Sequence, residues 1–230
     1  MQYPNEWLQG LSLGEKVASE LRLKIIEGSI KIGTVLSENQ IASEYEISRS
    51  PVREAFKTLS NEGLIRLERM GAIVQGLTQK DVEEMQDVRI LIETFVMQRI
   101  CQLPNEELIN KLNQMVDKME LAAKHQDYVE FSYLDLHFHL EIILAANHTR
   151  ILHLWNNLRN VILTFLLVAT ERRFTEETHE VSSLIEKHRS IVQALISKDS
   201  DYMEKMNRTH FEDTRKTVGN VLSKTISVDN

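Results

Sequence analysis

Apolar residues recur at helical spacing through the first part of the chain. In the stretch SLGEKVASELRLKIIEG they fall four positions apart on one face of a helix, which we expect to stop near Gly28. A second helix is predicted for SENQIASEY, because Ser37 and Gln40 have the spacing of a capping box. A third helix is predicted to begin near SRSP. The apolar positions of the first helix are Val17, Leu21 and Ile25.

Beyond NEGL the pattern changes from helical to alternating. The strings LIRLE and AIVQ flank RMG, and Gly71 can adopt the positive φ that a tight hairpin turn requires. Residues 11–76 are therefore predicted to form three helices followed by a hairpin. From residue 79 onward the pattern is almost wholly helical. The predicted helices lie near 79–101, 105–126, 128–146, 149–172, 178–197 and 199–223.

These patterns predict a mainly α protein with two domains. Most of the glycines precede Thr78, and this shift in composition marks a boundary. We expect a winged helix-turn-helix over residues 1–77, with the hairpin as its wing, and an all-α helical bundle over residues 78–230. A chain of 230 residues with 42% hydrophobic content is long enough to bury a core in each.

The charge distribution limits how this chain could bind nucleic acid. Its formal net charge is -7, which argues against a protein that coats nucleic acid through bulk positive charge. Up to Thr78 there are nine Lys and Arg against ten Asp and Glu, while the remainder has eighteen against twenty-four. If the protein binds DNA, it must do so through a local basic face in the first domain.

The chain lacks the sequence marks of a membrane or secreted protein. No apolar run approaches the roughly 20 residues that span a bilayer, and MQYPNEWLQG has neither the basic start nor the cleavage site of a signal peptide. We therefore expect a cytoplasmic protein with no membrane partner. The single Cys101 lies among apolar residues and excludes an internal disulfide.

The third predicted helix carries cations on one side. Arg49, Arg53 and Lys57 are four residues apart, so they line one face, with short donors from Ser48 and Ser50 beside them. This stripe is either a solvated face that keeps the protein soluble or a surface that grips phosphates and reads base edges. The wing would be tipped by Arg69 and Met70. The opposite, apolar face consists of Val52, Ala55, Phe56 and Leu59.

A longer stretch, from LRLKIIEG to GAIV, resembles the winged helix-turn-helix of the GntR family of bacterial transcription regulators. The string SRSPVREA stands in register with SENQIA and NEGLI, as in that family's signature. Two positions depart from it: Ile32 replaces a proline, and Asn39 replaces an arginine that some members use. The resemblance implies a homodimeric repressor on double-stranded DNA with a palindromic operator. The DNA-contacting positions it implies are Ser48, Arg49, Ser50, Arg53, Met70 and Gly71.

The helical part contains one aspartate and three histidines at suggestive positions. Asp135 and His139 are four residues apart and share a helix face, while His188 and His210 fall on two later helices. Three imidazoles and a carboxylate suit zinc, nickel or manganese. The alternative is that each histidine simply has a hydrogen-bonding neighbour in the core. His137 points elsewhere on its helix.

The helical part also resembles the FCD domain, the effector-binding module of the FadR subfamily of GntR regulators. Metal-binding members carry D-x3-H, then His, then His, in this order. The resemblance implies a divalent transition metal held by Asp135, His139, His188 and His210. Strings such as DVRILIETFV and WNNL extend the likeness over most of the chain and imply a small carboxylate effector, such as gluconate or another aldonic acid.

Two further residues are candidates for effector binding, each with a structural alternative. Arg89 either grips an effector carboxylate or forms an ion pair with Glu93 one helical turn away. Asn157 either donates to a sugar hydroxyl or ties helices together. Trp155 and Phe165 are predicted to be core.

Two other functions are alternatives to the regulator. The first is a small helical metalloenzyme in which Glu141 or Glu130 acts as base, although no convincing nucleophile accompanies the proposed ligands. The second is a FadR-type regulator without a metal, which the Asp and His set disfavours.

Overall fold

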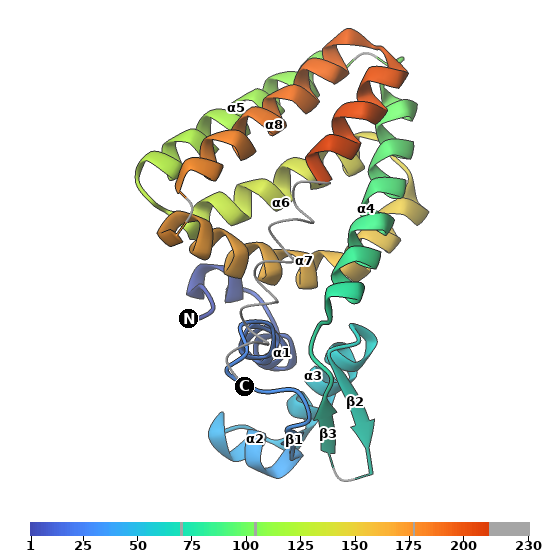
Figure 1. The fold of residues 1–230 in the computed structure, drawn as a ribbon. Coiled ribbons are helices and arrows are strands. Elements are labelled where there is room, and N and C mark those ends of the chain that lie inside the picture. The colour runs from blue at the N-terminus through green and yellow to red at the C-terminus, as the bar shows by residue number, and fades with distance from the viewer. Residues whose placement is uncertain (70, 104, 177, 212–230) are drawn as a thin grey trace. The chain divides into compact units, whose positions relative to one another are not determined.

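The computed structural model describes residues 1–69, 71–103, 105–176 and 178–211 (Figure 1). The chain forms two compact units, Met1–Thr78 and Gln79–Asn230. The first unit combines helices with a small sheet, and the described part of the second is helical. The predicted mainly α class is therefore confirmed.

The helices of the first unit follow the predicted order. α1 begins at a complete capping box, in which the Ser12 hydroxyl accepts from the Glu15 amide and the Glu15 carboxylate accepts from the Ser12 amide. The capping box predicted at α2 is wrong, because the Ser37 side chain makes no cap hydrogen bond. The bounds are η1 Asn5–Leu8, α1 Leu13–Ile26, α2 Glu38–Glu44 and α3 Arg49–Asn61.

The core of the first unit lies between α1 and α3. The apolar face of α3 is buried, as its four-residue spacing predicts. A buried ion pair joins the two helices: Arg22 donates from Nε and Nη2 to the Glu62 carboxylate at 2.8 and 2.7 Å. Losing one partner of such a pair costs about 3–5 kcal/mol, because the other charge remains buried. α3 is thereby held firmly with its opposite face outward.

A three-stranded antiparallel sheet completes the first unit. Its strands are β1 Val35–Leu36, β2 Ile65–Glu68 and β3 Gly71–Val74, in the order β1-β3-β2. β2 and β3 form the predicted hairpin, which is confirmed. β1 was not predicted, because a strand of two residues shows no alternation. Gly71 has φ of +148°, and a Cβ there would clash with the Leu36 carbonyl oxygen.

The second unit is a bundle around α6, which packs against α4, α5 and α7, while α5 lies beside α8 (Figure 1). Residues 200–211 are also helical. The predicted helices are therefore confirmed over the described residues, while the stretch 212–223 of the last one lies outside them. The bounds are α4 Gln79–Ile100, α5 Glu106–Lys124, α6 Tyr128–Ala145, α7 Thr149–Glu176 and α8 Thr178–Ser197.

α7 bears on the expectation that no segment of the chain is apolar enough to span a membrane. At 28 residues, with an 18-residue window of mean hydropathy 1.3, it is long and apolar enough to cross a membrane by length and composition alone. Counting uninterrupted apolar runs missed it, because Asn and Arg residues punctuate its first half. α7 packs against α6 and α8, and Trp155 and Phe165 are buried as predicted. We interpret it as a core helix of the bundle.

Candidate DNA-binding face and metal centre

The exposed side of α3 carries the predicted basic stripe. Arg49, Arg53 and Lys57 are all exposed, opposite the buried apolar residues. Ser48 is the N-cap residue of α3, and its hydroxyl makes no cap hydrogen bond. The Arg53 side chain is 55% exposed, and its Nε donates to Glu38 Oε2 at 2.8 Å. This face therefore offers cations and hydroxyl groups on one rigid helix.

The two wing positions differ in what the structure places there. Met70 lies outside the described residues. Gly71 is buried at the start of β3, where its lack of a side chain allows close approach to Leu36. Gly71 therefore shapes the hairpin through its backbone. Arg66 is exposed on β2 and pairs with Glu68 at 3.1 Å.

The four predicted metal ligands come together in the second unit. α6 supplies Asp135 and His139 from one face, α8 supplies His188, and the helical segment 200–211 supplies His210. All four side chains are buried. One ring nitrogen from each histidine lies within 4.8 Å of the others. Asp135 Oδ1 lies 3.7 Å from His139 Nε2 and 3.6 Å from His188 Nε2.

Hydrogen bonds orient two of the imidazole rings. His139 Nδ1 lies 2.5 Å from Glu93 Oε2, and His188 Nδ1 lies 2.8 Å from the Leu184 carbonyl oxygen. Since both partners are acceptors, each Nδ1 carries a proton, and in the neutral ring each Nε2 presents a lone pair. Among the described residues, neither Nε2 makes a hydrogen bond, although both are buried. Their lone pairs therefore face the cluster itself.

The spacing of these atoms fits a shared cation. Metal–nitrogen bonds of about 2.0–2.1 Å place neighbouring ligand atoms about 3–4 Å apart. The Asp135 oxygen lies within that range from two imidazole nitrogens, at 3.6 and 3.7 Å, yet beyond hydrogen-bonding distance. Together with His210, these residues would hold a divalent transition metal. Such an ion would supply a Lewis-acidic centre with room for ligand oxygen atoms.

The local electrostatics favour metal-binding protonation states for Asp135, His139 and His210. Burial raises the pKa of Asp135, but neighbouring positive charges outweigh it and hold that pKa at about 2. Burial also raises the pKa of Glu93, and His139 and Arg89 reverse the effect, so the net pKa is lowered. Burial lowers the pKa of His139, and lowers that of His210 well below its usual value. Ionised carboxylates and neutral imidazoles are the forms that bind metals.

The structure shows the ion pair that is one of the two interpretations of Arg89, and effector binding by Arg89 stays a prediction. Its Nε donates to Glu93 Oε1 at 3.2 Å, so the ion pair exists, but both side chains are buried rather than exposed. The guanidinium also lies over the rings of Trp155 and Phe211, with 5.5 and 4.6 Å to the ring centroids. Its Nη2 has no hydrogen-bond partner among the described residues. A buried cationic N–H without an acceptor suits a carboxylate ligand.

Glu93 is the functional residue that the sequence reasoning missed. Its sequence spacing indicates only a partner for Arg89, yet its other oxygen contacts His139. It thus links the guanidinium to the imidazole of a candidate metal ligand through one carboxylate. The four-residue spacing from Arg89 to Glu93 was the available signal. The contact to His139 needed the packing of α4 against α6.

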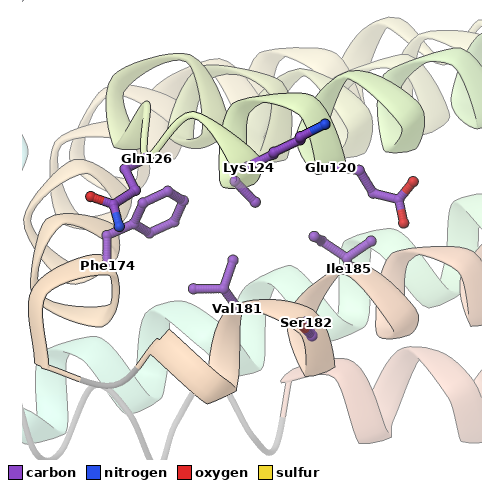
Figure 2. Close-up of a pocket in the computed structure, with 8 residues that line it drawn as sticks. Glu120, Lys124, Gln126, Phe174, Val181, Ser182 and Ile185 are labelled. Carbon is purple, nitrogen blue, oxygen red and sulfur yellow. The ribbon is translucent and has the colours of Figure 1, made fainter.

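Asn157 is not brought to the cluster. It is exposed on α7, whereas the four candidate ligands and Arg89 are buried. A separate pocket of about 340 Å³ lies between the ends of α5 and α7 and the start of α8 (Figure 2). Lys124, Phe174 and Ile185 contribute to its lining, and none of the four predicted ligands does. This pocket is therefore separate from the cluster of the four predicted metal ligands.

A winged helix-turn-helix with an exposed basic helix, joined to a helical domain with a buried set of metal-type donors, defines a DNA-binding transcription regulator with a sensor domain. The profile described as "Bacterial regulatory proteins, gntR family" matches residues 13–74, and the profile described as "FCD domain" matches residues 84–213. The chain belongs to the GntR family, and its helical unit carries an FCD domain.

The chain is similar to known proteins over nearly its whole length. The chain is 42% identical to the gluconate operon transcriptional repressor of Bacillus licheniformis and 43% identical to that of Bacillus subtilis strain 168, each over 94% of this chain and 89% of the relative. The solved structure of E. coli McbR/YncC matches with a TM-score of 0.69 at 17% identity, over 91% of this chain and 98% of that one, which shows a shared fold. The chain is a transcription regulator, and the metalloenzyme interpretation is rejected.

Proposed function

We propose that this repressor senses a small carboxylate, gluconate or another sugar acid, at a metal held by Asp135, His139, His188 and His210. The names of the Bacillus relatives support the effector class. The observation that carries the proposal is the Asp135 oxygen at 3.6 and 3.7 Å from two imidazole nitrogens that have no hydrogen bond among the described residues.

The charges around the cluster favour a cation and then an anion. Asp135 and Glu93 contribute two buried carboxylates, and Arg89 contributes one buried guanidinium. With neutral imidazoles this set carries one net negative charge, which a divalent cation would convert to one net positive charge. A monocarboxylate would then bring the site to neutrality. Burying charge is costly unless it is compensated, so the two ligands would stabilise each other's binding.

Arg89 supports the same sequence of events. Its Nη2 is buried and has no acceptor among the described residues, and a carboxylate oxygen of the effector would satisfy it. Its stacking on Phe211 and Trp155 fixes the guanidinium plane. Because Glu93 touches both Arg89 and His139, effector contacts at Arg89 would be felt at a metal ligand. Asn157, which is exposed, would reach a sugar hydroxyl only through movement of α7.

We further propose that the repressor acts in the cytoplasm as a homodimer on a palindromic operator. Ser48, Arg49, Ser50 and Arg53 would contact bases and phosphates, with the wing in an adjacent groove. One side of α4 exposes the apolar residues Val88, Leu91 and Phe95. They support a contact surface between two copies of the second unit. Two copies related by a two-fold axis would match two half-sites.

Repression and release would differ by a population shift. Effector and operator would each favour a different arrangement of the helices, and residues 76–79 would connect the sensor to the DNA-binding unit. A coupling free energy of about 1–3 kcal/mol changes affinity roughly 5- to 150-fold. The metal would anchor the effector and take no part in a reaction.

Metal content tests the site directly. Wild-type protein, loaded with zinc, nickel or manganese and desalted, should retain about one equivalent per chain, and the His188→Ala, His210→Ala double variant should retain little, because half of the donors are gone. His137→Ala is a matched control: His137 lies on α6 with its Nδ1 at the Tyr133 carbonyl oxygen, away from the cluster. Elemental analysis measures the ratio, and a full equivalent in the double variant would refute the assigned ligands.

A further inference from the structure

The cation at the centre of the exposed α3 stripe has an acidic partner on the neighbouring helix. Arg53 Nε donates to Glu38 Oε2 at 2.8 Å, across the turn between α2 and α3. The Glu38 side chain is only 26% exposed, and Glu38 is the first residue of α2. In the described part of the chain, Arg49 and Lys57 on the same stripe have no ion pair. The stripe therefore contains one tethered cation, Arg53, which is held by an ion pair. Arg49 and Lys57 on either side of it are untethered, because they have no ion pair among the described residues.

The hydrogen bond to Glu38 leaves the two Nη groups of Arg53 available to contact a base. The bond to Glu38 uses Nε, so the two terminal Nη groups remain available as a donor pair on a side chain that is 55% exposed. Such a pair matches the O6 and N7 acceptors of guanine in the major groove. A long side chain otherwise samples many rotamers, and fixing the guanidinium before binding removes part of the ordering cost.

We propose that Glu38 is a positioning residue that orients Arg53 to read a guanine, while the untethered Arg49 and Lys57 hold phosphates. This inference rests on the proposed DNA-binding role of α3. Glu38 has its carboxylate committed to Arg53, and as an anion it gains nothing from approaching the DNA backbone. Its contribution to operator affinity is therefore indirect and acts through one base pair.

The sign of the effect separates this role from simple electrostatics. Removing an acidic charge beside a DNA-binding surface ordinarily strengthens binding to every sequence, because repulsion with phosphates is reduced. A positioning residue behaves differently, since its removal weakens binding only to duplexes that contain the guanine read by Arg53. If Glu38 instead masked Arg53, its removal would strengthen operator binding.

The experiment uses full-length protein and an operator selected from a random duplex library with the wild type. Fluorescence anisotropy at fixed salt would compare the selected duplex with a scrambled one. Glu38→Gln should weaken binding to the selected duplex about tenfold, within the roughly 5- to 150-fold that one bidentate base contact is worth, and leave the scrambled duplex unchanged or bound more tightly. Glu46→Gln, which removes the same charge from an exposed position in the turn after α2, should leave selected binding within about twofold.

Arg53→Ala and the double variant complete the design. If Glu38 acts through Arg53, adding Glu38→Gln to Arg53→Ala should cause no further loss, whereas a structural role would add its own loss. Undiminished operator binding by Glu38→Gln, or equal weakening on both duplexes, would overturn the inference. If Arg53→Ala itself leaves operator binding intact, the DNA-binding role of α3 fails instead. Glu38→Asp, which keeps the charge but shortens the reach, should resemble Glu38→Gln and serves if that variant folds poorly.

Discussion

Single side chains in the sensor unit carry more than their sequence spacing implies. Arg89 and Glu93 are one helical turn apart, a pattern that in an exposed helix contributes only a few tenths of a kcal/mol. Here both side chains are buried, at 2% and 0% exposure, and Glu93 also contacts His139. In a buried region, the same pair orients a candidate metal ligand, and the Arg89 Nη2 has no acceptor among the described residues.

Arg89→Lys tests that assignment while keeping the charge that compensates Glu93. The lysine lacks a planar pair of donors, so gluconate affinity should fall about tenfold or more, while metal content and helical content stay at wild-type levels. Isothermal titration of the metal-loaded protein measures the affinity. Arg159→Lys, at an exposed position of α7, is the control and should not change it. Equal gluconate affinity in Arg89→Lys and wild type would leave Arg89 as a purely structural ion-pair partner.

The limits of sequence reasoning at this scale are physical. The spacing of Asp135 and His139 places both on one face of a helix, but spacing cannot say which helices meet that face. His188 and His210 are further candidate donors on later helices, and only the resemblance to the FCD domain implies that all four residues bind one metal. The link from Glu93 to His139 depends on how α4 packs on α6, and no pattern within either helix encodes that contact.

Among whole elements, the hairpin that follows α3 depends on one close approach between backbones. β3 begins at Gly71, whose backbone has φ of +148° and passes the Leu36 carbonyl oxygen of β1 with no room for a Cβ. Gly63 provides a comparison, because it has φ of +76° but nothing within 4 Å of a Cβ. The two glycines thus separate backbone strain from steric clash.

Gly71→Ala should destabilise the first unit more than Gly63→Ala does. The left-handed conformation alone costs a non-glycine residue about 1–2 kcal/mol, and a clash with fixed backbone adds a further penalty at Gly71. Differential scanning calorimetry of the full chain should show a larger fall in melting temperature for Gly71→Ala, accompanied by weaker operator binding. Equal falls in melting temperature for the two variants would mean that β1 moves away from the added Cβ without a measurable loss of stability.

The elements themselves were predicted where their period is long enough to be read. α3 shows its buried and exposed faces in the four-residue spacing of Arg49, Arg53 and Lys57, and the structure follows it. β1 has two residues and therefore no period. The capping box expected at Ser37 failed because a cap depends on the side-chain rotamer as well as on spacing.

In the molecule as a whole, each of the two units carries a different candidate site. The first presents exposed cations on a helix held by the buried pair of Arg22 and Glu62, and the second encloses three histidines and Asp135. The glycine distribution and the change from alternating to helical pattern were enough to predict two units in this order. The identity of a bound effector is set by contacts inside the bundle, which periodicity does not report.

The central claim is that a carboxylate bound at the metal centre controls operator affinity. It is tested most directly by measuring the affinity of metal-loaded protein for the selected operator, with and without saturating gluconate, before and after a chelator. We predict that gluconate weakens operator binding between roughly 5- and 150-fold, and that chelation or the His188→Ala, His210→Ala substitutions abolish this response. Operator affinity that responds equally to gluconate with and without the metal would contradict the account.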